Sequence, residues 1–103
     1  MTEPTVHELN IAPRWFDAVA RGTKPFEVRR DDRGYAVGDV LLLREFAGYS
    51  GEWVSGLYCM EPQYTGRSCR RTVTYVLRHE DFPAGVPEGY CVLGIQEEAT
   101  ADE

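Results

Sequence analysis

The sequence predicts an α+β protein, a small mixed β-barrel of about five or six strands with one short N-terminal helix. Five segments carry the alternating apolar pattern, or the β-branched and aromatic content, that is typical of strands. One early segment has apolar residues at helical spacing, and turns rich in glycine separate the segments. With 103 residues and no internal repeat, the chain is expected to form a single domain over residues 1–96.

The N-terminal helix is the best-marked element. The strand before it is expected at residues 5–11, where polar and apolar positions alternate. Pro13 begins the helix, because the fixed φ of proline suits a first helical turn. Gly22 stands where a left-handed C-cap belongs. The apolar positions between these two residues follow helical spacing: Trp15, Phe16, Val19 and Ala20.

The next strand is expected at residues 25–30, because the proline at its first position disfavours a helix in the residue before it. Side chains alternate between the two faces of a strand. Phe26 and Val28 therefore share one face, which we expect to join the core. Glu27 and Arg29 share the opposite face.

Three further strands complete the predicted barrel. The apolar run at residues 40–46 suits a strand buried on both faces, and residues 68–78 and 90–95 are rich in β-branched and apolar side chains. Residues 47–66, which contain several glycines and tyrosines, are expected to form the longest irregular stretch, with a short hairpin left open inside it.

Composition predicts a cytoplasmic protein without membrane contact, cofactor or metal. No stretch approaches the ~20 apolar residues of a membrane span, and no basic-then-apolar signal opens the chain. The three cysteines are odd in number and form no Cys-x-x-Cys pair, so reduced, buried thiols are expected. Their spacing from His7 and His79 matches no common zinc pattern.

The acidic net charge lies mostly at the ends of the chain. Glu3 and the four acids of residues 97–103 account for five negative charges, and removing them from the net charge of −6 leaves about −1 for residues 6–96. We expect residues 97–103 to form an acidic, disordered tail. A protein that coats a duplex needs a basic excess, so any nucleic-acid contact should be local.

Lys24 is the only lysine among eleven basic residues. A lysine ammonium is a compact point charge that can lose its proton when partly buried, whereas arginine stays protonated. The position therefore suggests a special role for Lys24, although a single lysine is also compatible with chance.

The chain resembles the ASCH domain superfamily, whose motif Gly-x-Lys-x-x-Glu-x-Arg follows the first helix. Gly22, Lys24, Glu27 and Arg29 meet this motif. Further segments resemble a small bacterial and phage subfamily of unknown function, and the similarity spans roughly residues 6–95. These segments are His7-Glu8-Leu9, Phe16, Asp32-Arg33, Val37-Gly38-Asp39, Leu43-Arg44-Glu45, Tyr64-Thr65-Gly66-Arg67 and Val73-Thr74-Tyr75-Val76.

The resemblance implies a PUA-like β-barrel that binds RNA or a modified nucleotide in a cleft between helix and barrel. Some members of the superfamily are amidohydrolases that remove the acetyl group of N4-acetylcytidine. If this chain were such an enzyme, Lys24 and Glu27 would be its catalytic residues. Those enzymes usually carry threonine where Glu27 stands, so the resemblance favours binding over deacetylation.

The candidate site is centred on the motif. Lys24 can neutralise a phosphate or donate to a base carbonyl, Glu27 can accept from an amino group, and Arg29 suits phosphate or guanine. The alternative is that these charges only form an ion pair that braces the barrel mouth. The complete set of candidate nucleotide-binding residues is Gly22, Lys24, Glu27, Arg29, Arg33, Trp15, Tyr64 and Arg67.

Three functions stay open at this point. The preferred function is a binding module for RNA or a modified nucleotide. The second is an amidohydrolase acting on a modified nucleoside, and the third is a small host-interaction protein with no nucleotide site. The sequence predicts no oligomeric state.

Overall fold

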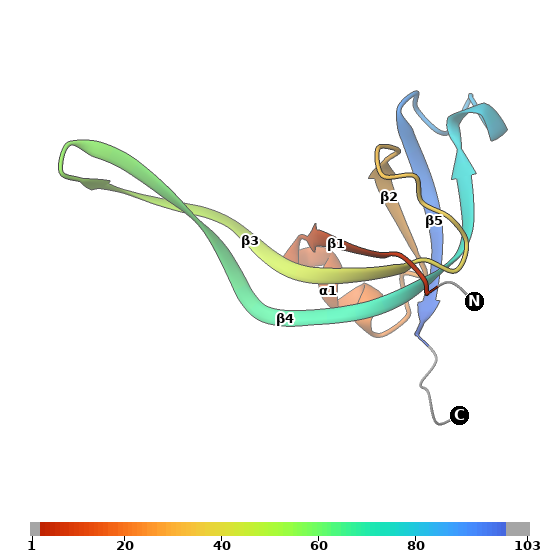
Figure 1. Ribbon diagram of the computed structural model, residues 1–103, viewed down its shortest axis with the longest axis horizontal. Helices are drawn as coiled ribbons and strands as arrows, with labels where there is room; N and C mark the ends of the chain where they lie inside the picture. The colour runs from red at the N-terminus through yellow and green to blue at the C-terminus, as the bar shows by residue number, and fades with distance from the viewer. Residues whose placement is uncertain (1–2, 99–103) are drawn as a thin grey trace.

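The strands of the protein form one open sheet of five strands, described for residues 3–98 in a computed structural model (Figure 1). One α-helix and one short 3₁₀-helix accompany the sheet. In chain order the elements are β1 (Val6–Ile11), α1 (Pro13–Ala20), β2 (Phe26–Arg30), β3 (Val40–Val54), β4 (Leu57–Arg78), the 3₁₀-helix (His79–Asp81) and β5 (Tyr90–Glu97).

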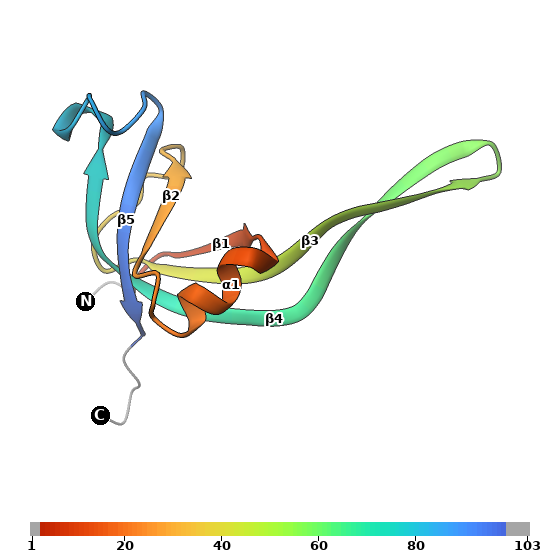
Figure 2. The same ribbon diagram turned by 180° about the vertical axis from the view of Figure 1, so that it is seen from behind.

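The sheet is sharply bent. Its spatial order is β1-β3-β4-β5-β2, with β1 parallel to β3 and every other neighbouring pair antiparallel. β4 first runs beside β3 and then turns to pair with β5, as the two opposite views show (Figures 1 and 2). The register of β4 and β5 shifts between Val73 and Tyr75, and such a bulge bends the strand that carries it.

The expected barrel is not formed. β1 and β2 are the two edges of the sheet and do not pair with each other. These strands have only six and five residues, and charged side chains of β2 stand in the gap between them. Closure requires a continuous ladder around the barrel, and two short edge strands separated by charged groups do not supply one. The prediction of a closed, PUA-like barrel was therefore wrong.

The core lies between α1 and the concave side of the bent sheet. Phe16 and Val19 of α1 are buried, and so are the predicted core residues Leu41 and Leu43 of β3. The remaining buried members of the core are Leu9, Ile11, Tyr35, Val73, Cys91, Leu93 and Ile95. Cys91 is buried, and burial raises the pKa of its thiol. Cys59 was also expected to be buried, but it is exposed.

The helix has the predicted limits. Pro13 is its first residue, and Gly22 follows its end with a φ of 80°, in the left-handed region that favours glycine. The Gly22 amide donates to the Val19 carbonyl, so the turn ends the helix and directs the chain toward β2.

The faces of β2 were assigned the wrong way round. Phe26 and Val28 are exposed, whereas Glu27 is only 4% exposed. β2 is an edge strand, and its charged face points toward the interior of the bent sheet. Alternation alone shows which residues share a face, but hydrophobicity pointed to the wrong face as the buried one.

Residues 47–64 form a long, two-stranded β-ribbon, which we call the arm, instead of the irregular stretch that the sequence suggested. The arm projects away from the body of the protein (Figure 1). Ser55 and Gly56 connect its strands with φ values of 51° and 83°. Two residues with positive φ are the geometry of a type I′ hairpin turn, which matches the right-handed twist of the strands.

The first two residues of the predicted acidic tail, Glu97 and Glu98, belong to the described structure. Glu97 ends β5, and Glu98 accepts two hydrogen bonds from Arg70, so these two residues are ordered parts of the structure. The rest of the expected tail lies outside the described residues. Over residues 3–98, no helix has the length and hydrophobicity needed to cross a membrane. In the same range, no three residues of the metal-binding types cluster together.

We predict that the body folds without the arm, because no residue of the arm belongs to the buried core. In the variant, an Asn-Gly turn replaces residues 49–62. Circular dichroism on heating should show one cooperative transition, with a Tm within a few degrees of the full chain. A broad, non-cooperative transition would show instead that the arm is part of the folding unit.

Candidate functional site

The gap between the two edge strands contains a cavity of about 540 Å³. Asn10 and Ile11 at the end of β1 form one wall, and Trp15 of α1 adds an aromatic wall. Ala12 also lines the cavity, and β2 and the loop before it supply the rest of the lining: Lys24, Phe26, Glu27, Val28 and Arg29. Its size lies within the range of about 300–1,000 Å³ that is usual for small-molecule sites.

Three charged side chains of the predicted motif meet in this cavity. The Nζ of Lys24 lies 2.6 Å from Oε1 of Glu27. Arg29 donates from Nε and Nη2 to Oε2 of the same carboxylate, over 2.9 and 2.7 Å. Glu27 is nearly inaccessible to solvent, so a buried carboxylate is neutralised by two cations.

Local structure explains this convergence. The Lys24 amide donates to the Ala18 carbonyl of α1, which fixes the loop just after the helix. Glu27 pairs with Leu93 of β5 along the backbone, and Arg29 lies two residues further on the same face of β2. Lys24 also donates to the Phe26 carbonyl and lies 4.9 Å from the centroid of the Phe26 ring.

The triad presents hydrogen-bond donors to a ligand. Glu27 already accepts three hydrogen bonds. Lys24 donates two of its three N–H groups, and Arg29 donates two of its five, to described residues. One ammonium N–H and three guanidinium N–H groups therefore remain. A ligand that bears carbonyl, ring-nitrogen or phosphate acceptors matches this wall of the cavity.

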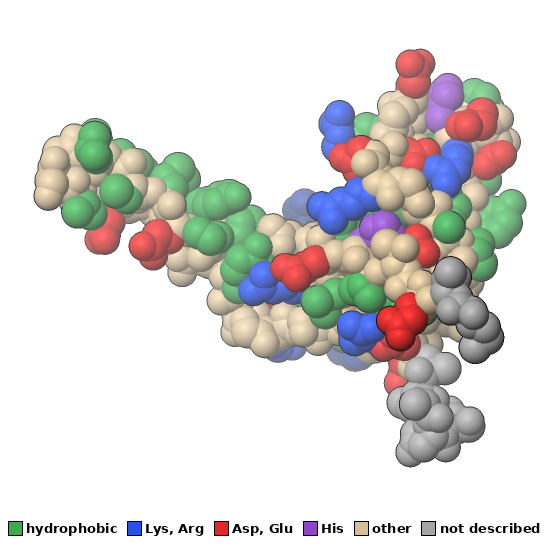
Figure 3. Space-filling model, in the orientation of Figure 1, with side chains coloured by type: hydrophobic (Ala, Val, Ile, Leu, Met, Phe, Trp, Pro, Cys, Tyr) green, Lys and Arg blue, Asp and Glu red, His purple; other side chains and the backbone are tan. Residues whose placement is uncertain are grey.

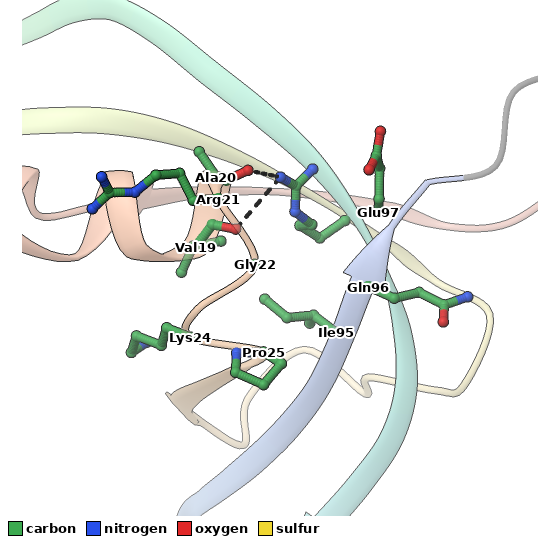
Figure 4. A pocket seen from close by; sticks show the side chains of 10 residues that line it. Val19, Ala20, Arg21, Gly22, Lys24, Pro25, Ile95, Gln96 and Glu97 are labelled. Carbon is green, nitrogen blue, oxygen red and sulfur yellow. Dashed lines mark hydrogen bonds between the residues drawn. The ribbon is translucent and has the colours of Figure 1, made fainter.

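A second cavity, of about 270 Å³, lies on the other side of the Lys24 loop (Figure 4). Arg71 crosses it and donates to the carbonyl oxygens of Val19 and Ala20, at the C-terminus of α1. Helix C-termini carry a partial negative charge, which Arg71 offsets. Glu97 also lines this cavity, and its negative charge makes the cavity a poor environment for an anion. It is better explained as part of the helix cap.

The structure brings together four of the eight predicted site residues, Trp15, Lys24, Glu27 and Arg29, around the first cavity. Gly22 lines the second cavity instead. Arg33 donates to the Glu8 carbonyl, and its contacts lie outside the first cavity.

Tyr64 and Arg67 do not line the first cavity, but both lie at the root of the arm. The Tyr64 hydroxyl donates to Oδ1 of Asn10, so Tyr64 reaches the cavity only through this cavity residue. The Arg67 guanidinium lies 4.6 Å from the centroid of the Phe16 ring and pairs with Asp17.

Glu45 and Arg67 form a second, independent ion pair. Arg67 donates from Nε and Nη2 to the two carboxylate oxygens of Glu45, each over 2.9 Å, and the Thr65 hydroxyl donates to Oε1. The hydrogen bonds from Arg67 and Thr65 hold the pKa of the Glu45 carboxyl below its usual value. Glu45 is therefore committed to fixing the root of the arm and does not face the cavity.

Sequence reasoning missed Asn10 and the apolar lining of the cavity. Asn10 occupies an exposed position of β1, one residue before the strand ends. No sequence motif distinguishes this asparagine from an ordinary surface residue. Phe26 and Val28 were assigned to the core because they are hydrophobic. Their place beside the charged motif on a short strand was the available signal that they lie at an edge.

Two comparisons relate the chain to known proteins. Residues 6–95 match the family described as Domain of unknown function (DUF3850). The Escherichia phage P2 protein named "Uncharacterized 12.9 kDa protein in GpA 3'region" is 34% identical over 77 residues, which are 75% of this chain and 59% of the phage protein. The chain thus spans less than two thirds of the length of this relative.

We predict that the Glu45–Arg67 pair makes stability dependent on acid pH. Because the folded state lowers the pKa of Glu45, the stabilisation is complete above the usual carboxyl pKa. It is lost as the pH falls through the lower pKa of the folded protein. Urea unfolding at a series of pH values should show a shallower acid decline in Glu45→Gln than in the wild type. Glu52→Gln, at an exposed position of the arm, is the matched control and should keep the wild-type slope.

Proposed function

The chain belongs to the family described as Domain of unknown function (DUF3850), and we propose that it binds RNA or a modified nucleotide in the cavity between β1 and β2. The observation that carries this proposal is the pairing of a donor-rich wall with apolar walls. Lys24 and Arg29 supply the donors, and Trp15, Phe26 and Val28 supply the apolar surface.

This combination suits a nucleobase. Every base has a flat π-face that stacks on aromatic side chains, a contact worth about 1–3 kcal/mol per base. Trp15 and Phe26 are roughly half exposed, which leaves their ring surfaces free for such a contact. Base carbonyls, ring nitrogens and phosphate oxygens are acceptors that the remaining N–H groups of Lys24 and Arg29 can reach.

The charge distribution supports a small ligand or a single nucleotide of a chain. Residues 6–96 carry almost no net charge, so they lack the basic excess that a duplex-coating protein needs. Two cations held by one buried carboxylate supply a local positive charge only. We therefore propose contact with one or two nucleotides rather than with an extended backbone.

The resemblance of the Gly22–Arg29 motif to ASCH domains implies the same class of ligand, RNA or a modified nucleotide. Here Glu27 acts as a positioning residue: it holds the Lys24 and Arg29 donors in place and does not contact the ligand. This role differs from the reading of Glu27 as an acceptor for an amino group, because its oxygens already accept three hydrogen bonds.

The same geometry disfavours the amidohydrolase alternative. A general base needs a free lone pair aimed at the proton that it removes. Both oxygens of Glu27 are engaged by cations, and Lys24 Nζ is held between this carboxylate and a backbone carbonyl.

We predict that nucleosides bind at this cavity and that Lys24→Ala and Arg29→Ala each weaken binding about tenfold, which corresponds to about 1.4 kcal/mol. The probes are cytidine, N4-acetylcytidine, guanosine 5′-monophosphate and a short single-stranded RNA. Amide and indole shifts in NMR titrations should map to Trp15 and β2. Lys24→Arg should keep most of the affinity, because the positive charge survives.

Arg21→Ala is the matched control, since Arg21 lies on the same loop but lines only the second cavity. It should bind like the wild type. The binding proposal fails if no probe shifts the signals of Trp15 or β2, or if Arg21→Ala weakens binding as much as Lys24→Ala. Release of acetate from N4-acetylcytidine that is lost in both Lys24→Ala and Lys24→Arg would favour the enzyme instead.

A further inference from the structure

The arm has two chemically different faces. Residues that pair across a two-stranded ribbon point to the same face, and the next pair points to the other. Tyr49–Pro62, Gly51–Met60 and Trp53–Tyr58 therefore share one face. Ser50–Glu61, Glu52–Cys59 and Val54–Leu57 share the opposite face, which carries both acidic residues of the arm.

The first of these faces, which we call the aromatic face, is exposed although it is apolar. Tyr49, Trp53, Tyr58 and Met60 are 62%, 72%, 53% and 59% exposed. Figure 3 shows apolar side chains along the arm, well away from the body. The rings are ordered among themselves, because Tyr58 lies over Gly51 and meets Trp53 edge-on, with 5.2 Å between the ring centroids.

An isolated two-stranded ribbon with an exposed apolar face is stabilised when another surface packs on it. Two-stranded hairpins are only marginally stable in water by themselves. Half of the exposed large hydrophobic residues of the described chain lie between Tyr49 and Tyr64, and at the root of the arm the Phe46 ring meets Tyr49, with 5.2 Å between the ring centroids. Contiguous apolar surface of this type is typical of interaction sites.

We propose that the aromatic face docks on the same face of a second copy of this chain. Self-association requires a surface that does not repel itself, and the aromatic face carries no charged side chain. Glu52 and Glu61 lie on the opposite face, so they point outward when two arms pack face to face. Such packing is the ordinary arrangement of two sheets about 10 Å apart.

The available area is sufficient for a weak, specific dimer. A buried aromatic side chain removes about 150–250 Å² from water. Four large side chains that are more than half exposed therefore offer on the order of 500 Å² per copy. Two copies reach the ~1,000 Å² at which specific interfaces begin.

Charge argues against a nucleic-acid partner at this surface. Residues 45–66 contain no lysine, arginine or histidine, and their acidic side chains would repel phosphates. The cavity residues lie in the body rather than on the arm. The dimer is therefore independent of the proposed nucleotide binding, and either can fail without the other.

The test is sedimentation velocity of the full chain over a wide concentration range in reducing buffer. A reductant is needed because Cys59 on the arm is exposed and can form an intermolecular disulfide. We expect a reversible monomer–dimer equilibrium. Trp53→Glu should weaken association at least about tenfold, because it replaces the most exposed ring of the aromatic face with a charge.

Leu57→Glu is the matched control. It makes the same type of change at an exposed residue beside the same turn, but on the opposite face, and it should dimerise like the wild type. The Trp15→Phe variant leaves Trp53 as the sole tryptophan, and its emission should shift to the blue as the concentration rises. A chain that stays monomeric at every concentration overturns the proposal. Equal loss of association in both glutamate variants overturns it as well, and so does a dimer that survives Trp53→Glu.

Discussion

The buried carboxylate of Glu27 is the constraint on which the site depends. A charge removed from water is costly unless it is paired and hydrogen-bonded, and Glu27 meets this condition by binding Lys24 and Arg29 at once. Its position on the inner face of β2 keeps a polar group in the gap between the edge strands. The same interaction leaves the sheet open and orients two cations toward a cavity that a closed barrel would lack.

Ion pairs of this kind hold the other irregular parts of the molecule. Glu45 and Arg67 join the root of the arm to α1, while Arg78 and Asp31 hold the loop after β2 against the end of β4. Each pair links segments that are distant in the sequence. The apolar core is small and lies on one side of the bent sheet, so polar contacts at its margins position the elements that the core does not reach.

The order of the elements along the chain could be predicted from local sequence signals. The topology of the sheet could not be predicted in this way. Pro13 and Gly22 mark the helix because their backbone preferences act within a few residues. The apolar run at residues 40–46 likewise marks a buried strand. Whether β1 meets β2 depends instead on the bend of β4, which a one-residue bulge produces without a clear sequence signature. The resemblance to ASCH domains, which rested on the motif and on further segments over residues 6–95, implied a closed barrel that this chain does not form.

Residue spacing indicated which side chains of β2 lie together, whereas hydrophobicity pointed to the wrong face of this strand as the buried one. Glu27 and Arg29 converge because a strand brings residues two apart to one face, and Lys24 reaches Glu27 from the loop before β2. Phe26 and Val28 were misassigned because an exposed edge strand with a charged inner face inverts the usual pattern. Arg67, Tyr64 and Arg33 are bound by partners 22, 54 and 25 residues away, and such pairings are not visible in a single sequence.

Because the arm is a β-hairpin, its length can change without a change in the rest of the fold. Adding two residues to each strand preserves which side chains share a face, because the repeat of a β-strand is two residues. Such insertions would extend the projection without altering the register at Val40 or the geometry around Glu27, since neither lies in the ribbon beyond the bulge. The reach of the arm is thus an adjustable dimension, and evolution can vary it while the ligand cavity stays unchanged.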